Sequence, residues 1–142
     1  MKELTQNPLF GQLAKLELPT ADFAVFGSGP MYAYALREQI HDLDLIARGS
    51  AWKKAAILQA PVKPASGDGN VIRLFDDAIE IFDSWAPGEW DVNEVIDTAE
   101  VLQEIKFVTL ANVLKWKKLM GREKDLTDIQ KIEEYLKHQN SY

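Results

Sequence analysis

Two aspartates one residue apart, Asp42 and Asp44, interrupt the apolar run DLDLIA. Successive side chains of a strand point to opposite faces, so a strand here would set both carboxylates on one face and Leu43 and Leu45 on the other. Carboxylates within about 4 to 6 Å of each other repel, and one of them takes up a proton unless a cation neutralises both. This spacing therefore predicts a site for a divalent metal ion.

A glycine turn comes before the two aspartates. Gly27 and Ser28 follow an apolar run, and 13 residues, enough for one helix and a turn, separate Ser28 from Asp42. Backbone N–H groups at the start of a helix, with a serine hydroxyl beside them, form a good seat for a phosphate group. The lysine of a Walker A loop is absent from this turn. We expect the turn and the aspartates to lie at neighbouring strand ends.

Hydrophobic patterns predict the elements that must position these groups. Strands are expected at 22–27, 42–47, 71–75 and 78–83, the last two as a hairpin about Asp76-Asp77, while 99–105 is strand or irregular. Helices are expected at 7–16, from 31, at 50–60 with Ser50 as N-cap, and at 91–97, 109–121 and 123–139. We predict an α+β fold, one domain over residues 1–142 with a mixed sheet of about four to five strands flanked by helices, two of them C-terminal.

Composition narrows the classes of function. The 142-residue chain has no cysteine, which excludes disulfides, zinc–thiolate centres and thiol nucleophiles, and it has only two histidines. A net charge of −6 argues against broad nucleic-acid binding through the phosphate backbone, although a small anion can still arrive together with a metal ion. No apolar stretch reaches about 18 residues and no signal peptide is evident, so we expect a cytoplasmic protein without membrane association.

The glycine turn and the aspartates together resemble a known signature. Gly27-Ser28, 13 residues and then Asp42-Leu43-Asp44-Leu45 are similar to the motif of the nucleotidyltransferase superfamily that includes DNA polymerase β, particularly its small single-domain bacterial members. Those members include toxin–antitoxin and antibiotic-modifying nucleotidyltransferases. The resemblance implies a nucleotidyltransferase-like fold with a third acid, flanked by apolar residues, on a later strand. Ile79-Glu80-Ile81 fits this position best, and Asp83, on the opposite face of the strand, is the alternative.

The resemblance also implies roles for these residues. Asp42, Asp44 and Glu80 would be the catalytic and metal-binding residues, holding two Mg²⁺ ions that bridge the phosphates of a nucleoside triphosphate. Gly27 and Ser28, with nearby backbone amides, would bind the β- and γ-phosphates. The implied reaction moves a nucleoside monophosphate from an NTP, with ATP the expected donor, to an unknown small molecule or protein, and releases pyrophosphate.

The segment 114–125 concentrates five basic residues in this acidic chain. Helical spacing places Lys117 inside an apolar stripe, so its ammonium group must reach an edge or meet an anion. The segment 124–128, KDLTD, resembles one that often follows the sheet in small nucleotidyltransferases, with a similar lysine before it. Three interpretations are open for Lys117: nucleotide binding through the triphosphate, a structural role, or an ion pair with Asp125, for which Arg122 is the other candidate partner.

Other side chains are secondary candidates for contact with the nucleotide. Arg37 and His41 flank the turn that precedes Asp42, which would bring them near the phosphates. Trp52 and Trp116 either stack on a base or belong to the core, because tryptophans at helical spacing commonly do the latter. Arg37 is the one of these that we expect to bind the nucleotide.

Two other functions are compatible with the sequence. Because 142 residues leave little chain for a dedicated acceptor-binding domain, the alternative is a weakly active or inactive nucleotidyltransferase-like binding module, an antitoxin or regulatory subunit with a protein partner. The partner can also be the acceptor, so both functions can coexist. The third interpretation is an ordinary α+β domain with incidental acids, which would gain if Asp42, Asp44 and Glu80 lay far apart.

Overall fold

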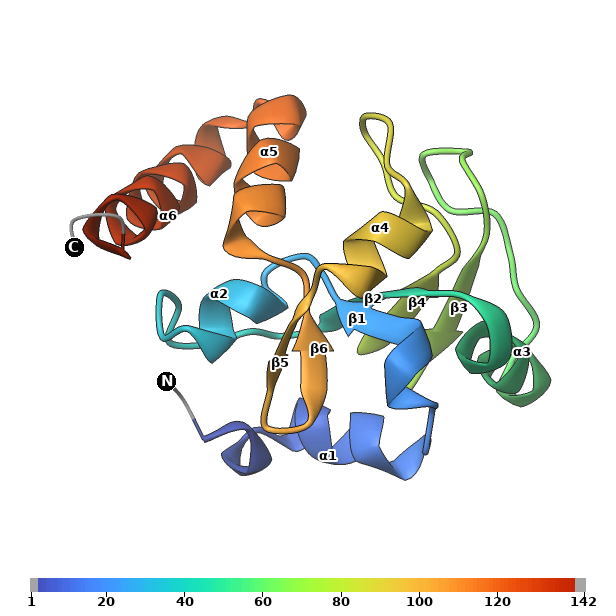
Figure 1. Cartoon of the computed structure of the whole chain (residues 1–142). Helices are drawn as coiled ribbons and strands as arrows, with labels where there is room; N and C mark the ends of the chain where they lie inside the picture. Colours follow the sequence, from blue (N-terminus) through green and yellow to red (C-terminus); the bar gives the residue numbers. More distant parts are fainter. Residues whose placement is uncertain (1–2, 140–142) are drawn as a thin grey trace.

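A mixed six-stranded sheet forms the centre of the computed structural model, which describes residues 3–139 (Figure 1). The strand order is β3-β4-β2-β1-β6-β5. The strands are β1 (Phe23–Val25), β2 (Leu43–Ala47), β3 (Val71–Leu74), β4 (Ile79–Phe82), β5 (Glu100–Leu102) and β6 (Ile105–Phe107). β2 runs parallel to β4 and antiparallel to β1, β6 runs parallel to β1, and the β3–β4 and β5–β6 pairs are antiparallel.

Six α-helices accompany the sheet within residues 3–139. They are α1 (Pro8–Lys15), α2 (Gly29–Ala33), α3 (Gly49–Leu58), α4 (Val92–Asp97), α5 (Leu110–Met120) and α6 (Leu126–Gln139). The predicted α+β class and the two C-terminal helices are thus confirmed. The longest of these helices, α6, has 14 residues, and none in the described part of the chain combines the length and apolar character that crossing a bilayer requires.

The predicted count of four to five strands is wrong, because β5 and β6 form a further hairpin at one edge of the sheet. Their two-residue connection, Gln103 and Glu104, has positive φ angles of 49° and 70°. Tight hairpin turns of this kind normally carry Asn or Gly, which adopt positive φ at little cost. The segment 99–105 therefore lacks the usual sequence signal for a hairpin.

Ser50 is not the N-cap of α3, contrary to the prediction. The helix begins at Gly49, its capping position is Arg48, and no side chain caps it. The Ser50 hydroxyl instead donates a hydrogen bond of 2.7 Å to Asp22 Oδ2. Ser50 thus ties the first turn of α3 to the chain just before β1, a contact that helical periodicity does not reveal.

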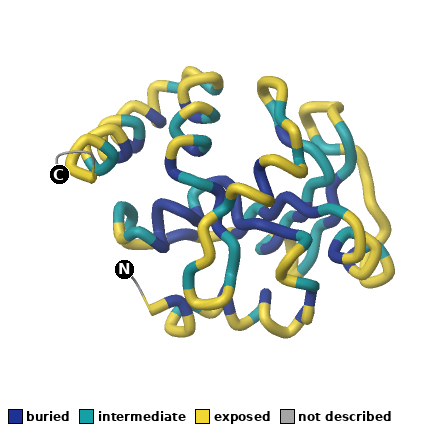
Figure 2. The backbone as a smooth tube through the Cα atoms, in the orientation of Figure 1, coloured by how far each residue is buried: buried dark blue, intermediate teal, exposed yellow. Residues whose placement is uncertain are grey.

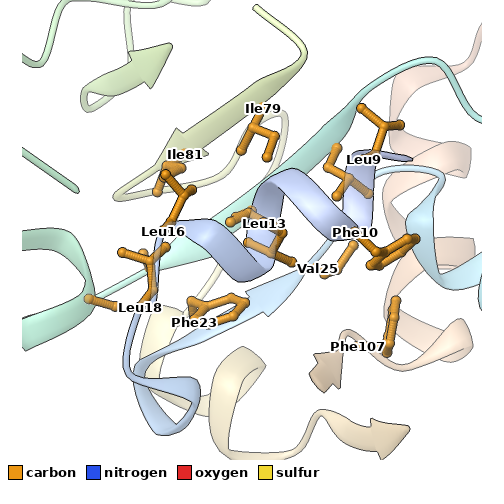
Figure 3. Packing of buried hydrophobic residues seen from close by; sticks show 14 of the residues in the cluster. Leu9, Phe10, Leu13, Leu16, Leu18, Phe23, Val25, Ile79, Ile81 and Phe107 are labelled. Atoms are coloured by element: carbon orange, nitrogen blue, oxygen red, sulfur yellow. The ribbon is translucent and has the colours of Figure 1, made fainter. Parts of the chain in front are cut away.

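One face of the sheet packs against α1, α2 and α3. Strand residues such as Val25 and Ile81 point to this face and are completely buried. Leu9, Phe10 and Leu13 of α1 cover them from the same side (Figure 3). Buried positions accordingly concentrate in the strands and on the helix surfaces turned toward them (Figure 2). This face is an apolar core.

The other face packs against α4 and α5 and holds an aromatic cluster. Phe26, just after β1, stacks on Trp85 with ring centroids 4.1 Å apart. Trp116 of α5 meets both of these rings edge-on, whereas Trp52 packs against the core of the opposite face. The cluster fixes α5 over the end of β1. The part of this face over β2, β4 and β3 carries polar residues, including those of the candidate site.

Candidate functional site

Asp44, Glu80 and Arg73 form a row across three neighbouring strands. Asp44 of β2 pairs in register with Glu80 of β4, and Glu80 pairs with Arg73 of β3. Register partners on adjacent strands point to the same face, and such strands lie about 4.8 Å apart. Two of the predicted carboxylates are therefore side by side, which weighs against the interpretation that they are incidental acids lying far apart.

The Asp44 carboxylate has no compensating partner. Within residues 3–139 it accepts no hydrogen bond and forms no ion pair. Burial, together with the negative charges of Asp42 and Glu80, raises the pKa of this carboxyl from 3.8 to about 7. A cation held by these oxygens would restore the ionised form, so the chemistry of the donor set suits a metal ion.

The three predicted ligands are neighbours in the fold without converging on one point. Asp42 lies one residue before β2 and is exposed. One carboxylate oxygen of Glu80 is held by Arg73, whose Nε lies 2.9 Å from Glu80 Oε2. Among the described residues, no three His, Cys, Asp or Glu side chains are gathered as a ready metal-binding group.

Asp83, the alternative third carboxylate, is engaged by the neighbouring loop. Its oxygens accept a hydrogen bond of 2.7 Å from the backbone N–H of Asn70 and another of 2.9 Å from Asn70 Nδ2. These bonds attach the start of β3 to the end of β4. Glu80, and not Asp83, is the residue that lies beside Asp44 on the adjacent strand.

Gly27, two residues after the end of β1, lies directly against Asp44. Its φ of +61° is in the left-handed region, and a Cβ at this residue would lie 2.8 Å from Asp44 Oδ2. The N–H of Phe26 donates a hydrogen bond of 2.8 Å to the backbone carbonyl of Asp44. Ser28 precedes the five-residue helix α2, which its side chain does not cap. The glycine turn and the aspartate strand therefore meet at neighbouring strand ends, as their spacing predicts.

A pocket of about 400 Å³ lies beside the row of charged residues. The loop after α3 and the segment after β4 form part of its wall. Its charged and aromatic lining side chains are those of Asp44, Asp68, Arg73, Glu80, Phe82, Trp85 and Trp116. A pocket that joins charged groups to flat aromatic surfaces suits a ligand with an ionic part and a planar part.

A second pocket of about 410 Å³ lies between α1 and the β5–β6 turn. Its lining is mainly apolar and includes Phe10, Leu13 and Phe23. None of the predicted site residues lines this second pocket, so the chemistry is expected at the first.

Lys117 and Arg37 belong to a separate group of charges at the α5–α6 junction. The buried ammonium group of Lys117 lies 3.3 Å from Asp125 Oδ1 and 3.2 Å from Asp128 Oδ2. Arg37 lies 2.9 Å from the same oxygen of Asp128, and Arg122 contacts Asp125 at 2.7 Å. Burial raises the pKa of Asp125, but the hydrogen bond from Arg122 and the charge of Lys117 outweigh it and hold that pKa below its usual value. Both of the ion pairs considered for Asp125 are present.

These two basic residues do not line the first pocket, although the ammonium group of Lys117 lies 5.3 Å from the centre of the Trp116 ring. Among the described residues that line it, neither Lys117 nor Arg37 appears, although Trp116, the neighbour of Lys117, does. His41 is exposed and lines a shallow hollow near α1 and α2. The structure therefore brings together Gly27, Asp44 and Glu80, and it leaves the basic candidates with acidic partners or at other surfaces.

Arg73 and Trp85 are members of the site that the sequence patterns did not single out. A hairpin centred on Asp76-Asp77 pairs residue 73 with residue 80, so the hairpin register is a signal for Arg73. Trp85 follows β4 in a segment without periodicity. No local pattern indicates that its ring stacks on Phe26.

No family model, no curated protein and no solved structure matches this chain. Function is therefore inferred from the carboxylates, the glycine turn and the pocket. All three features occupy one region, where the end of β1, the start of β2 and the middle of β4 are adjacent.

Proposed function

We propose that this protein is a metal-dependent nucleotidyltransferase with a nucleotidyltransferase-like fold. It would move a nucleoside monophosphate from an NTP, with ATP the expected donor, to a small-molecule or protein acceptor and release pyrophosphate. The observation that carries this proposal is that the unpaired Asp44 carboxylate lines one pocket together with Glu80, its register partner, while the Gly27 turn packs against Asp44. Such a site offers ligands for a metal, space for phosphate and room for a planar base.

Asp42, Asp44 and Glu80 would hold two Mg²⁺ ions, and these residues fit that role. Carboxylate oxygens are the protein ligands that Mg²⁺ prefers. Asp44 supports the assignment because its carboxyl is partly buried, unpaired and close to two other acids. Bound Mg²⁺ supplies electrostatic stabilisation of the phosphate charges during transfer.

The strand order suggests where donor and acceptor would lie. β2 separates the Gly27 turn of β1 from Glu80 of β4. In-line displacement requires the attacking and leaving oxygens on opposite sides of the phosphorus. The Gly27-Ser28 turn would therefore bind the β- and γ-phosphates that leave, while Glu80, across Asp44, would accept the proton of the attacking hydroxyl group.

Aromatic side chains support binding of the planar part of a ligand. Trp116 and Trp85 line the pocket, and the indole N–H of Trp116 is already bound to the carbonyl of Ala86 at 3.1 Å. Because that hydrogen bond fixes the ring, a base packing against it would lose little further side-chain freedom. Lys117 and Arg37 stay outside this assignment, since both are paired with acids of the C-terminal segment.

A weakly active or inactive module that binds a protein partner is the second candidate function. The ion pair between Arg73 and Glu80 favours this binding module, because Arg73 already neutralises the charge of Glu80 in part without a metal ion. Ile57 and Leu58 at the end of α3, residues that are 85% and 50% exposed, offer apolar surface for such a partner. This module would act as an antitoxin or regulatory subunit.

Calorimetric titration of the protein with each NTP, with and without Mg²⁺, tests the proposed function. Wild type should bind at least one NTP only when Mg²⁺ is present, and Asp44→Asn should lose that binding. Asp77→Asn, in the exposed β3–β4 turn, changes charge equally and should bind as wild type does. Pyrophosphate release with candidate acceptors then tests transfer.

Two results would contradict the proposal that this protein is a metal-dependent nucleotidyltransferase. Equal Mg²⁺-dependent binding in wild type and Asp44→Asn would remove Asp44 from the metal site. A stable co-purifying protein, combined with no metal-dependent nucleotide binding, would favour the binding module instead.

A further inference from the structure

Arg73 is the positively charged member of the row that carries the proposed metal ligands. Its guanidinium group makes one hydrogen bond to the site, from Nε to Glu80 Oε2 at 2.9 Å. Both side chains are partly open to solvent, with 37% of Arg73 and 23% of Glu80 exposed. Arg73 therefore faces the same pocket as Asp44 and occupies one oxygen of a carboxylate that a metal would need.

The charges of the site are out of balance without a further cation. Three acids are close to one another there, because Glu80 is the register partner of Asp44 on the adjacent strand and Asp42 comes two residues before Asp44. Arg73 contacts only Glu80 among them. One guanidinium group thus neutralises one of three carboxylates, and Asp44 is left unpaired.

The contact between Arg73 and Glu80 is of a kind that can be exchanged. A partly exposed ion pair with a single hydrogen bond is weak compared with a buried or two-bonded pair. The arginine side chain is long, and the adjoining pocket of about 400 Å³ gives it space to turn without a change in the backbone. A divalent ion can hold several carboxylates at once, which a guanidinium bound to one of them does not.

We propose that Arg73 is the counter-ion of Glu80 in the metal-free protein and that a divalent metal ion displaces it. This inference rests on the proposed function, since it takes Glu80 as a metal ligand. Arg73 then acts as a positioning residue that sets the metal affinity of the site. It keeps Glu80 directed toward β3 until metal arrives, and it makes metal binding weaker than the three carboxylates alone would allow.

Titration of Mn²⁺, which occupies oxygen-ligand sites of the Mg²⁺ type, measures this competition without nucleotide or catalysis. Arg73→Gln removes the competing charge and should raise Mn²⁺ affinity about fivefold, the range expected for loss of a partly exposed ion pair. Arg73→Lys keeps the charge and should stay close to wild type. Lys118→Gln is the charge-matched control, because Lys118 pairs with Glu133 on the exposed side of α5 and α6 and should leave the affinity unchanged.

Thermal unfolding gives a second readout that is independent of metal titration. In buffer with EDTA, Arg73→Gln should unfold at a lower temperature than wild type, because Glu80 and Asp44 then lie side by side without a cation. Saturating Mn²⁺ should remove most of this difference, since the ion replaces the lost guanidinium. A variant with a merely structural defect would keep the same deficit in both buffers.

The outcomes separate this inference from the proposed function. Unchanged or weaker Mn²⁺ binding in Arg73→Gln, together with loss of binding in Asp44→Asn, would overturn the counter-ion role and leave the metal site standing. If wild type and Asp44→Asn bind Mn²⁺ equally, the metal site and the role of Arg73 are both overturned. The displacement of Arg73 by the metal ion would be established by two results together. Arg73→Gln, but not Lys118→Gln, would bind Mn²⁺ more tightly than wild type, and Mn²⁺ would restore the thermal stability of Arg73→Gln.

Discussion

Gly27 and Asp44 are packed so closely that residue 27 has no room for a side chain beside the carboxylate. A Cβ at Gly27 would lie 2.8 Å from Asp44 Oδ2, and the φ of +61° adds strain for any other residue. The close approach joins the turn proposed for phosphate to the aspartate proposed for metal. The backbone conformation therefore favours glycine here, and any larger residue would force the Asp44 side chain to shift.

Gly27→Ala should lower the free energy of unfolding by about 1 to 3 kcal/mol and weaken Mg²⁺-dependent NTP binding, because Asp44 must move. Urea unfolding and calorimetry measure the two effects. Gly67→Ala is the matched control, since Gly67 also has a positive φ, +80°, but no atom lies within 4 Å of its Cβ position. Loss of NTP binding to the same extent in both variants would contradict the proposed role of the Gly27–Asp44 contact.

The raised pKa of Asp44 predicts a pH-dependent stability in the absence of metal. The folded carboxyl has a pKa of about 7 against 3.8 for an ordinary aspartate, so the folded state binds this proton more tightly than the unfolded state does. The protonated Asp44 carboxyl contributes its full stabilisation of the folded state below about pH 4. As the pH rises through 7 this contribution is lost, and the free energy of unfolding falls by up to about 4 kcal/mol. Asp44→Asn cannot ionise and should escape this loss.

Urea unfolding in EDTA at pH 4 and pH 8 checks this prediction. Relative to wild type, Asp44→Asn should gain stability at pH 8 but not at pH 4, whereas Asp77→Asn should show no such change. Mg²⁺ should bind wild type more tightly at pH 8 than at pH 6, because metal and proton compete for the same oxygens. A stability difference between wild type and Asp44→Asn that is the same at both pH values would count against the buried, unpaired carboxyl.

Lys117 is expected to matter for stability more than for the nucleotide. Its side chain is 2% exposed and is shared by Asp125 and Asp128. Lys117→Met should cost about 3 kcal/mol, because two buried acids lose a common cation. Lys118→Met, which breaks an exposed pair with Glu133, should cost about 0.5 kcal/mol.

The same two variants test the triphosphate contact predicted for Lys117. Because Lys117 lies outside the lining of the Asp44 pocket, we expect folded Lys117→Met to bind MgATP within about twofold of wild type, which is about 0.4 kcal/mol. Calorimetry below the unfolding temperature measures this. A tenfold loss confined to Lys117→Met would support contact with the triphosphate.

Local sequence patterns predicted the elements that hold the site. Alternation of apolar residues indicated β2 and the β3–β4 hairpin, and the 13-residue spacing predicted that Gly27 would meet the aspartate strand. These features depend on short-range rules, namely two-residue side-chain periodicity and the chain length needed for a helix and a turn. The register of the β3–β4 hairpin also contained the Arg73–Glu80 pair.

The features of the structure that the sequence did not predict depend on contacts between segments that are distant in the chain. The β5–β6 turn adopts positive φ at Gln103 and Glu104, residues that rarely indicate it. Asp128 becomes a partner of Lys117 only when α5 and α6 pack together, and Trp85 reaches Phe26 across the sheet face. Such contacts leave no periodic signal in one segment, which is why the sequence alone did not indicate them.

The third carboxylate can be decided by comparing Glu80→Gln with Asp83→Asn. Glu80 is the register partner of Asp44, whereas both oxygens of Asp83 accept hydrogen bonds from Asn70. Glu80→Gln should abolish metal-dependent transfer and weaken Mn²⁺ binding at least tenfold, while it remains folded. Asp83→Asn should lower the free energy of unfolding by about 1 to 2 kcal/mol through weaker bonds to the loop, with little change in Mn²⁺ affinity. Calorimetry and urea unfolding separate the two effects, and the reverse pattern, lost Mn²⁺ binding in Asp83→Asn with wild-type binding in Glu80→Gln, would move the third ligand to Asp83.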